Sequence, residues 1–355
     1  MAKLFYIGHV VAGFNDGGQS RNRAFMQAFL NKKASIKAVY DSNPLIRFFN
    51  GLNLLTFLLF SKGNQIFVHQ GTLIVLFPMP VLKYGWIRKL VFKLLQHAAD
   101  RNTVTIEVND LPYEQSKDLE LPVRQLDKVF QESLYSLKNA HYVFASHEMG
   151  KYVHKKYNSP YSVVINGSDR VKDFLTSDPA PACFNSLETK YIYAGGLNKG
   201  RQIELLISKF RGRKEILILI GEWGDWLSDY ELPANIFYLG KFQEDYAHYL
   251  ASRCDIGLIP YDENRFYYNI CYPTKASFYI TAGIPFLSTP LEELKNVFEK
   301  SGMVYFVPID GWDEFIEHFD SSSLSDTKKK IELQKHQFYW DDLLGTYLNA
   351  QSEPL

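Results

Sequence analysis

The segment Tyr272-Pro273-Thr274-Lys275-Ala276-Ser277-Phe278-Tyr279-Ile280-Thr281-Ala282-Gly283-Ile284-Pro285 predicts a loop, a helix and then a strand. Pro273 suits the approach to a helix, and Thr274 is a residue type that caps one. Gly283 suits the end of that helix, after which the apolar run 284–287 predicts a short strand. This order of elements is typical of an alternating α/β domain.

The start of this predicted helix has the chemistry of an anion site. The first turn of a helix carries backbone N–H groups without partners in the helix, and this one adds the hydroxyl of Ser277 and the cation of Lys275. A cation is unfavourable beside the positive end of a helix dipole unless an anion is present. We therefore expect an anion to bind where a strand meets this helix, although a solvated lysine is the alternative.

Length and charge narrow the class of protein. At 355 residues the chain is long enough for two hydrophobic cores, and its 39 basic and 39 acidic residues balance, which does not indicate nucleic acid as a partner. The three cysteines form no CxxC pair and suit a reducing compartment. The start, Met1-Ala2-Lys3, has no features of a signal peptide, so we expect a cytoplasmic protein.

One uncharged segment, 48–60, invites comparison with a membrane span. A helix needs about 20 apolar residues to cross a bilayer, and this segment is shorter and contains Asn50, Gly51 and Asn53. We predict a buried helix here.

Apolar strands alternate with helical stretches twice along the chain. In the first half the expected strands are 4–7, 65–69, 103–108, 142–145 and 162–165, with helices near 20–31, 86–97 and 129–138. In the second half the expected strands are 191–194, 215–220, 236–239, 256–259 and 286–288, with helices at 203–210 and after Pro273. A Pro- and Ser-containing stretch at 176–181 predicts a linker between them. Two parallel-sheet domains follow, which bind ligands at the carboxyl ends of their strands.

Four motifs, in this order, resemble those of retaining GT-B glycosyltransferases of the group-1 type, and the likeness covers nearly the whole chain. They are the glycine turn Gly17-Gly18, the segment 164–167 (VING), the segment 193–201 (YAGGLNKGR) and the Lys275 segment. The run 338–342 (FYWDD) also resembles the last helix of that family. The second half is similar to enzymes of bacterial surface-polysaccharide assembly and to glucosyltransferases that extend O-glycans on streptococcal serine-rich adhesins.

The resemblance implies an α/β protein of GT-B architecture, with two Rossmann-like domains facing a cleft. The implied acceptor domain covers 1–170, followed by a linker at 171–182. The implied nucleotide-sugar domain covers 183–335. A helix within 336–355 is expected to cross back to the first domain.

The resemblance also implies a set of site residues. Asp110, Asn109 and Lys275 are the candidate catalytic residues, and Asp110 is as well explained as a residue that ends a strand. The candidate donor-binding residues are Gly17, Gly18, Gly196, Lys199, Arg201, Lys241, Phe242, Asn269, Tyr272, Thr274, Lys275 and Ser277. Gly17-Gly18 is equally a tight turn, and Glu107 is either an edge residue of its strand or faces the cleft.

Three positions depart from the pattern of the family. Phe278 stands where the family has a glutamate that holds the ribose, and Asn109 stands where a histidine is common. Gly196 stands where the family has an arginine, so Lys199 or Arg201 is expected to meet the diphosphate. The backbone at Lys241-Phe242 is the expected reader of the base, with a plain surface turn as the alternative.

The expected chemistry needs no metal and no cofactor. Sugar transfer from a nucleoside diphosphate develops negative charge on the leaving group, which fixed cations and a helix N-terminus stabilise. The chain has no Asp-x-Asp pair, the usual metal anchor of the other main glycosyltransferase fold. We expect metal-independent transfer from a UDP-sugar in polysaccharide or glycoprotein glycan synthesis. The alternatives are a nucleotide-sugar hydrolase, epimerase or phosphorylase, and a non-catalytic nucleotide-sugar-binding partner of a transferase complex.

The acceptor is expected to be a glycan, either lipid-linked or on a glycoprotein. Trp86, Lys89 and Lys93 share the outer face of a predicted helix, and such a face can rest on the anionic inner surface of a membrane. A solvated basic face is the alternative. The predicted core stripe of this helix consists of Ile87, Leu90, Val91, Leu94 and Leu95.

Overall fold

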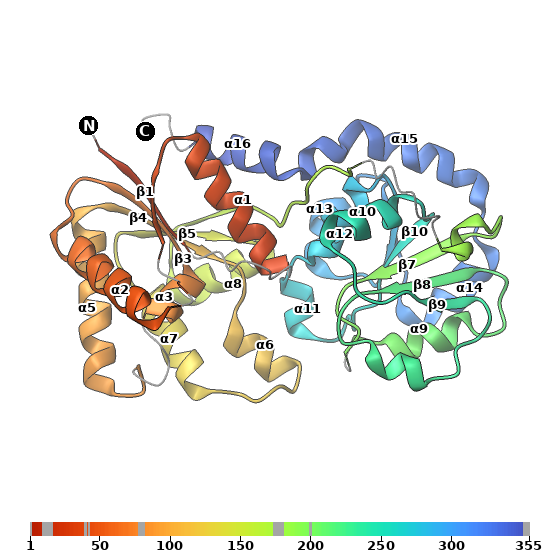
Figure 1. Cartoon of the computed structure of the whole chain (residues 1–355), viewed down its shortest axis with the longest axis horizontal. Helices are drawn as coiled ribbons and strands as arrows, with labels where there is room; N and C mark the ends of the chain where they lie inside the picture. Colours follow the sequence, from red (N-terminus) through yellow and green to blue (C-terminus); the bar gives the residue numbers. More distant parts are fainter. Residues whose placement is uncertain are drawn as a thin grey trace. The chain divides into compact units, whose positions relative to one another are not determined.

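The computed structural model describes residues 2–8, 17–38, 41, 43–76, 82–172, 181–198 and 201–350. The chain divides into two compact units: unit 1 comprises Met1–Ile165 with Leu344–Leu355, and unit 2 comprises Asn166–Leu343 (Figure 1). Each unit is built on one six-stranded sheet. The domain limits expected at 170, 183 and 336 stay predictions, and most of the expected linker lies outside the described residues.

The sheet of unit 1 has the strand order β2-β1-β3-β4-β5-β6, and all its pairs are parallel. Its strands are β1 (Leu4–Gly8), β2 (Ser35–Ala38), β3 (Gln65–His69), β4 (Thr103–Val108), β5 (Ala140–Phe144) and β6 (Tyr161–Val163). The order reverses between β1 and β3, which is the place where doubly wound sheets bind ligands.

Helices cover this sheet through aromatic and aliphatic side chains. Phe29 of α1 stacks on Tyr6 of β1, with ring centroids 5.0 Å apart, and Phe25 of the same helix stacks on Phe67 of β3 at 5.5 Å. The helices of unit 1 are α1 (Gly17–Asn31), α2 (Pro44–Phe60), α3 (Gln70–Leu76), α5 (Gly85–Arg101), α6 (Pro112–Asp118), α7 (Gln125–Tyr135) and α8 (His147–Tyr157).

The sheet of unit 2 has the strand order β12-β11-β10-β7-β8-β9, again with parallel pairs. Its strands are β7 (Lys190–Ala194), β8 (Ile216–Ile220), β9 (Ile236–Tyr238), β10 (Ile256–Ile259), β11 (Phe286–Ser288) and β12 (Val304–Phe306). Numbered within the unit, this is the 3-2-1-4-5-6 order of dinucleotide-binding domains. The order reverses between β7 and β10.

The helices of unit 2 pack around a core made chiefly by β7, β8 and α9. The α-helices are α9 (Ile203–Phe210), α10 (Glu244–Ser252), α11 (Phe266–Ile270), α12 (Thr274–Thr281), α13 (Glu292–Phe298), α14 (Trp312–His318), α15 (Leu324–Gln334) and α16 (Trp340–Ala350), which ends in unit 1. Short 3-10 turns lie at Ala182–Asn185, Asp225–Asp229, Ile309–Gly311, Ser321–Ser323 and Lys335–Phe338.

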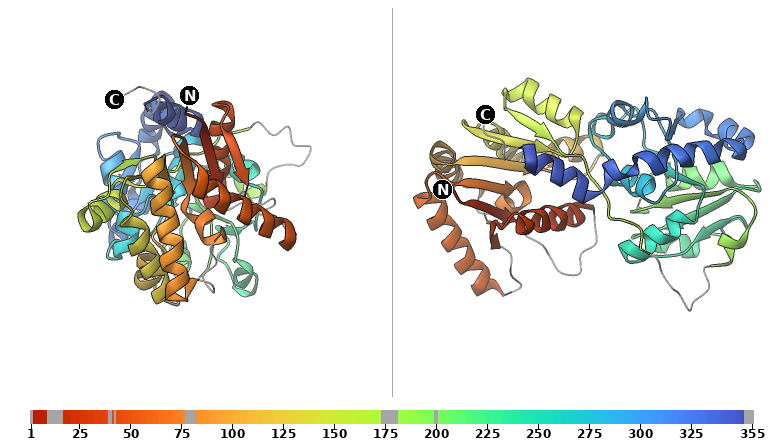
Figure 2. Two further views of the ribbon diagram at one scale, coloured as in Figure 1. Left: turned by 90° about the vertical axis from the view of Figure 1, so that its left-hand side faces the viewer. Right: turned by 90° about the horizontal axis from the view of Figure 1, so that it is seen from above.

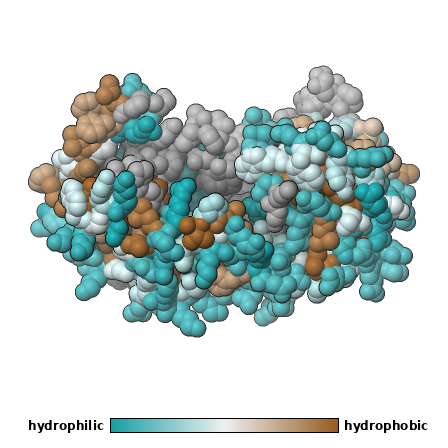
Figure 3. All heavy atoms as spheres, turned by 90° about the horizontal axis from the view of Figure 1, so that it is seen from below, coloured by the Kyte–Doolittle hydropathy of each residue, from teal (hydrophilic) through white to brown (hydrophobic). Residues whose placement is uncertain are grey.

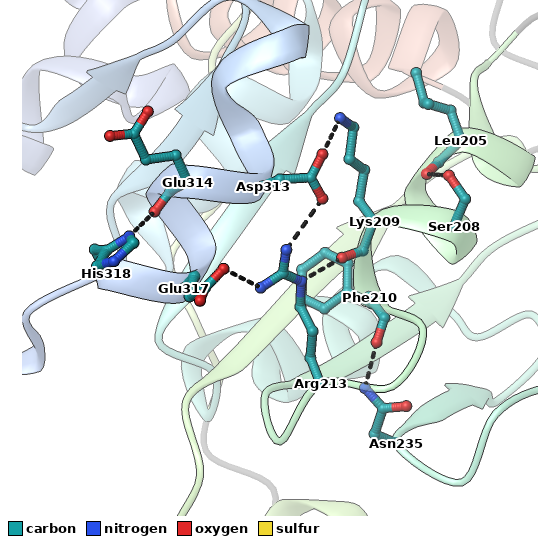
Figure 4. Close-up of polar contacts among 10 residues, drawn as sticks. All are labelled: Leu205, Ser208, Lys209, Phe210, Arg213, Asn235, Asp313, Glu314, Glu317 and His318. Carbon is teal, nitrogen blue, oxygen red and sulfur yellow. Dashed lines mark hydrogen bonds and ion pairs between the residues drawn. The ribbon is translucent and has the colours of Figure 1, made fainter.

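An ion-pair network joins α9 to α14 (Figure 4). Asp313 accepts from Lys209 and, at 3.1 Å, from Arg213, whose guanidinium also lies 3.6 Å from Glu317. The Asn235 side chain donates to the carbonyl oxygen of Phe210 at 2.8 Å and so closes the end of α9. The acidic partners are largely exposed, so we expect these pairs to add little to stability.

Two predictions about burial are wrong. The segment 48–60 forms most of α2, but most of its large apolar side chains are exposed, and only Leu54 and Leu58 are fully buried. Leu90, expected in the core stripe of α5, is also exposed. In both helices the apolar residues cover more of the circumference than the face that meets the sheet, so the sequence pattern does not mark which of them are buried.

Within the described residues, no helix is long and apolar enough to span a bilayer.

The free energy of unfolding should depend on pH through the buried side chain of His248 on α10. Its Nε2 lies 3.0 Å from the carbonyl oxygen of Phe278, and burial lowers its pKa from 6.5 to about 4. Because the unfolded chain takes up the proton first, the free energy of unfolding falls as pH drops from 6.5 to about 4. Between about pH 7.5 and about pH 5, wild type should lose about 2 kcal/mol more than His248→Asn.

Urea unfolding followed by tryptophan fluorescence measures this difference, and the exposed His336, changed to Asn, is the matched control. Equal pH dependence in wild type and His248→Asn would contradict the prediction.

Candidate active site

The site in unit 2 begins where two chain segments approach too closely for side chains. Gly195 follows β7 with φ +142°, and Gly221 follows β8 with φ +146°. The N–H of Gly195 donates to the carbonyl oxygen of Ile220 at 2.9 Å. A Cβ atom at Gly221 would lie 1.8 Å from the carbonyl oxygen of Gly195, so only glycine fits there.

Two cations converge on one phenol beside Gly195. The Nζ atom of Lys275 (α12) and the Nη1 atom of Arg201 (before α9) both donate to the hydroxyl oxygen of Tyr261, each at 3.1 Å. Tyr261 follows β10, so the three side chains meet at the reversal point between β7 and β10. A Cβ atom at Gly195 would lie 2.6 Å from Nζ of Lys275, which means that glycine leaves the room for this lysine.

Aromatic rings surround the two cations. Nζ of Lys275 lies 5.0 Å from the ring centroid of Tyr193, and the Arg201 guanidinium lies 5.4 Å from that of Tyr261. Tyr268 of α11 stacks on Tyr261 with centroids 4.4 Å apart. The contacts of Lys275 with Tyr193 and of Arg201 with Tyr261 are cation–π interactions, which hold cations without neutralising them.

Two positive charges lie beside the phenol of Tyr261. Burial by itself would raise the pKa of Tyr261, but the charges of Lys275 and Arg201 outweigh it and bring the pKa below its usual value. Within the described part of the chain, neither Lys275 nor Arg201 forms an ion pair with a carboxylate. Two partly buried cations that share only a phenol are arranged to receive an anion.

Trp223 occupies the space beside Gly196. Its φ is +59°, a left-handed conformation that is rare for a bulky residue, and its indole is exposed. A Cβ atom at Gly196 would lie 3.0 Å from this ring. A side chain at Gly196 would therefore crowd the Trp223 ring, and the guanidinium beside Tyr261 is that of Arg201.

The start of α12 differs in detail from the prediction. Pro273 is the N-cap residue and Thr274 the first helical residue, and no side chain caps this helix. The prediction that Thr274 caps it is therefore wrong, because proline already sets the extended backbone that a cap residue adopts.

Ser277 and Tyr272 face the interior of unit 2. The Ser277 hydroxyl donates to the carbonyl oxygen of Asn166 at 2.5 Å and lies 2.8 Å from the Tyr272 hydroxyl. The Asn166 side chain donates to the carbonyl oxygen of Tyr272 at 3.1 Å. These bonds tie the VING segment to α12, and contact of either side chain with a ligand stays a prediction.

Two further predicted residues also hold loops. The Asn269 side chain donates to the carbonyl oxygens of Glu263 and Arg265 at 2.7 and 3.0 Å, and it accepts from the N–H of Glu292 at 3.1 Å. Lys241 forms an ion pair with Glu222.

Aromatic side chains pack where the base and ribose are expected. The Phe242 ring meets that of Tyr246 edge-on, at 5.2 Å between centroids, and base reading by the backbone of 241–242 stays a prediction. Phe278 stacks on His248 at 4.6 Å. Burial lowers the pKa of His248, so this imidazole is neutral at neutral pH and offers a ribose no charged partner.

In unit 1 a buried ion pair lies at the carboxyl edge of the sheet. The Nε atom of Arg21 (α1) donates to Glu107 (β4), and its Nη1 atom donates to the carbonyl oxygen of Val164 at 2.7 Å. Arg21 and Glu107 are fully buried, and His69 of β3 lies 3.5 Å from Glu107. Burial lowers the pKa of His69, so this contact involves a neutral imidazole. Glu107 is thus neither an edge residue nor exposed.

The remaining predicted residues of unit 1 lie near this pair in sequence. Asn109 and Asp110 directly follow β4, where Asp110 is exposed and Asn109 half-buried. Gly17 and Gly18 form the first residues of α1 rather than a turn before it. Lys199, a predicted residue of unit 2, lies outside the described residues.

Sequence reasoning overlooked three aromatic residues of the unit 2 site: Tyr193, Trp223 and Tyr261. Tyr193 and Tyr261 stand at the carboxyl ends of β7 and β10, and the hydroxyl of Tyr193 donates to the carbonyl oxygen of Gly196 at 2.9 Å. Their position at strand ends was readable from the sequence. Their convergence depends on which strands are neighbours, which the sequence does not show.

Among the described residues, no group of three or more His, Cys, Asp or Glu side chains could hold a metal ion.

The architecture is that of the GT-B glycosyltransferases. No protein-family model matches the sequence, and no curated protein matches it. Among solved structures, sucrose-phosphate synthase from Thermosynechococcus elongatus is similar over 99% of this chain and 98% of its own, at 11% identity and a TM-score of 0.65.

Two other solved structures are similar over the whole length. HepE from Anabaena in complex with UDP-glucose aligns over 99% of this chain and 100% of its own, at 11% identity and a TM-score of 0.63. α,α-Trehalose 6-phosphate synthase from Burkholderia multivorans aligns over 98% of both chains, at 9% identity and a TM-score of 0.63. These similarities therefore show a shared fold. At such low sequence identity they do not show which residues form the site.

Exchanging Gly195 for alanine should displace Lys275 and weaken anion binding. The added Cβ would meet Nζ and Cε of Lys275 at 2.6 Å. We expect at least a tenfold weaker affinity for pyrophosphate, measured by calorimetry, because the cation must leave its place beside Tyr261.

Gly212→Ala is the matched control. Gly212 also has positive φ, +73°, but nothing lies within 4 Å of its Cβ position. Both variants should lose about 1 kcal/mol of stability. Unchanged pyrophosphate binding in Gly195→Ala would show that this glycine serves the turn alone.

Proposed function

We propose that this protein is a glycosyltransferase that binds a nucleoside diphosphate sugar in unit 2 and transfers the sugar to a glycan. The observation that carries the proposal is the convergence of Lys275 and Arg201 on Tyr261 at the reversal point of a dinucleotide-type sheet. The diphosphate would bind beside the phenol oxygen and accept hydrogen bonds from both cations. Solved structures of the same fold include complexes with UDP and with UDP-glucose, which supports a uridine nucleotide.

The two cations match the charge that transfer develops. As the bond between sugar and diphosphate breaks, negative charge grows on the leaving oxygen, and groups already fixed in place stabilise it without reorganising. A unit charge at about 4 Å contributes roughly 4 kcal/mol at an effective dielectric of 20, before desolvation is subtracted. Lys275 also stands in the first turn of α12, whose backbone N–H groups add to the same field.

The remaining parts of the proposal follow from the resemblance. The order of the motifs is the basis for proposing retention, metal independence and a role in surface-polysaccharide or glycoprotein glycan synthesis. The roles of Asp110 and Asn109 at the carboxyl end of β4, and of Lys199, Thr274 and the backbone at Lys241-Phe242, stay predictions. The anomeric configuration of the product, read by NMR, tests retention directly.

Lys275→Ala should separate catalysis from folding. We expect turnover to fall about a hundredfold or more, because the lost charge gains value as the leaving diphosphate forms. Thermal stability without ligand should change little, since removing one of two neighbouring cations relieves repulsion. UDP should raise the melting temperature of wild type, because ligand at about 100 times its dissociation constant adds roughly 2.7 kcal/mol, and the shift should shrink in the variant.

Lys214→Ala is the control, because this exposed lysine precedes β8 at the opposite edge of the sheet. Near wild-type turnover and UDP binding in Lys275→Ala, together with a lower melting temperature, would make the lysine structural. If UDP binds but no donor is turned over with or without acceptor, the protein is a binding partner of a transferase instead.

Activity should persist in EDTA. Two cations and a helix N-terminus supply the positive charge that a divalent ion supplies in metal-dependent enzymes. Initial rates of sugar transfer are measured with and without EDTA, and both measurements are repeated with added Mn²⁺. A strict requirement for Mn²⁺ or Mg²⁺ in the chemical step would refute metal independence while leaving the donor site intact.

A further inference from the structure

The helix α2 (Pro44–Phe60) exposes an apolar stripe along its length. Leu45, Phe48, Phe49, Leu52 and Leu59 share one face, since they stand at positions i, i+3, i+4, i+7 and i+14. Ile46 and Phe60 flank this stripe. The exposed fractions are Leu45 69%, Ile46 46%, Phe48 65%, Phe49 63%, Leu52 51%, Leu59 44% and Phe60 71%.

This stripe is not explained by packing within unit 1. A surface helix normally turns its apolar face inward and its polar face outward, and α2 already buries Leu54 and Leu58. Figure 2 shows α2 at the outer edge of unit 1, and Figure 3 shows apolar side chains gathered over it at the upper left. Contiguous apolar surface of this kind marks an interaction site.

The neighbouring helix α5 adds aromatic and basic groups. It packs against α2, and the Arg101 guanidinium donates to the carbonyl oxygen of Leu59 at 3.3 Å. Its exposed residues include Trp86 and Leu90, together with Lys89 and Lys93 on the same face. The two helices hold five basic residues, Arg47, Arg88, Lys89, Lys93 and Arg101, against one acidic residue, Asp100.

We propose that the α2–α5 surface docks on an anionic lipid bilayer, with α2 lying in the plane of the interface. Exposed Phe and Leu side chains supply apolar area for the acyl boundary, and the basic residues of α2 and α5 complement anionic headgroups. A second copy of the chain fits this surface less well, because its own basic residues would meet the same basic residues. This inference is independent of the donor site in unit 2.

Vesicle flotation tests the proposal with the full chain. Wild type should float with phosphatidylcholine vesicles that contain about 30% phosphatidylserine, and binding to pure phosphatidylcholine should be about tenfold weaker or more. The triple variant Phe48→Ser, Phe49→Ser, Leu52→Ser should lose about 100-fold in partitioning, because these side chains supply much of the buried apolar area. Thermal melting of the variant should match wild type, since the three side chains are exposed.

Two further variants make the outcome specific. Leu187→Ser with Leu333→Ser removes exposed apolar side chains of unit 2 and should leave flotation unchanged. Lys89→Glu with Lys93→Glu should weaken binding to the anionic vesicles alone. The proposal is overturned if wild type does not float, if the triple variant floats as well as wild type, or if the triple variant only changes the oligomeric state in sedimentation.

Discussion

The convergence of Lys275 and Arg201 on one phenol oxygen constrains the rest of unit 2. Two cations held at hydrogen-bonding distance from the same atom repel each other, and within the described residues no carboxylate offsets them. The unit holds them there by other means. Gly195 leaves room for the lysine side chain, the rings of Tyr193 and Tyr261 lie against the cations, and proline fixes the start of α12. Two cations placed this close together without a carboxylate are arranged to receive an anion.

Unit 1 has the opposite charge arrangement at the carboxyl edge of its sheet. There the charge is fully compensated: Arg21 and Glu107 are buried together, and Arg21 also donates to the carbonyl oxygen of Val164. The pair ties α1 to a central strand and to the segment after β6. Buried ion pairs stabilise little in net terms but are costly to break, so they fix one arrangement of the elements. Asn109 and Asp110 begin two residues after Glu107, and their position depends on this fixed strand end.

Much of the fold could be predicted from local pattern. Runs such as 256–259 and 216–220 are apolar throughout because both faces of a parallel strand are covered, and this marks β10 and β8 clearly. β2 and β12 were not predicted, and none of their described residues is fully buried. The burial of α2 was predicted wrongly. Its apolar residues cover more of the helix than the one face that meets the sheet, so the pattern does not tell which of them are buried and which meet solvent.

The sequence by itself determined the alternation of strands and helices in two units, the place of Lys275 in the first turn of a helix, and the presence of Phe278, Asn109 and Gly196. These are local properties of residue type and spacing, which neighbouring residues in the chain decide. Only the tertiary structure decided that Tyr261 stands between Arg201 and Lys275, that Trp223 fills the space at Gly196, and that α2 turns apolar side chains outward. Each of these depends on which strands and helices become neighbours. That choice rests on packing summed over the whole unit, and no single segment of the chain carries it.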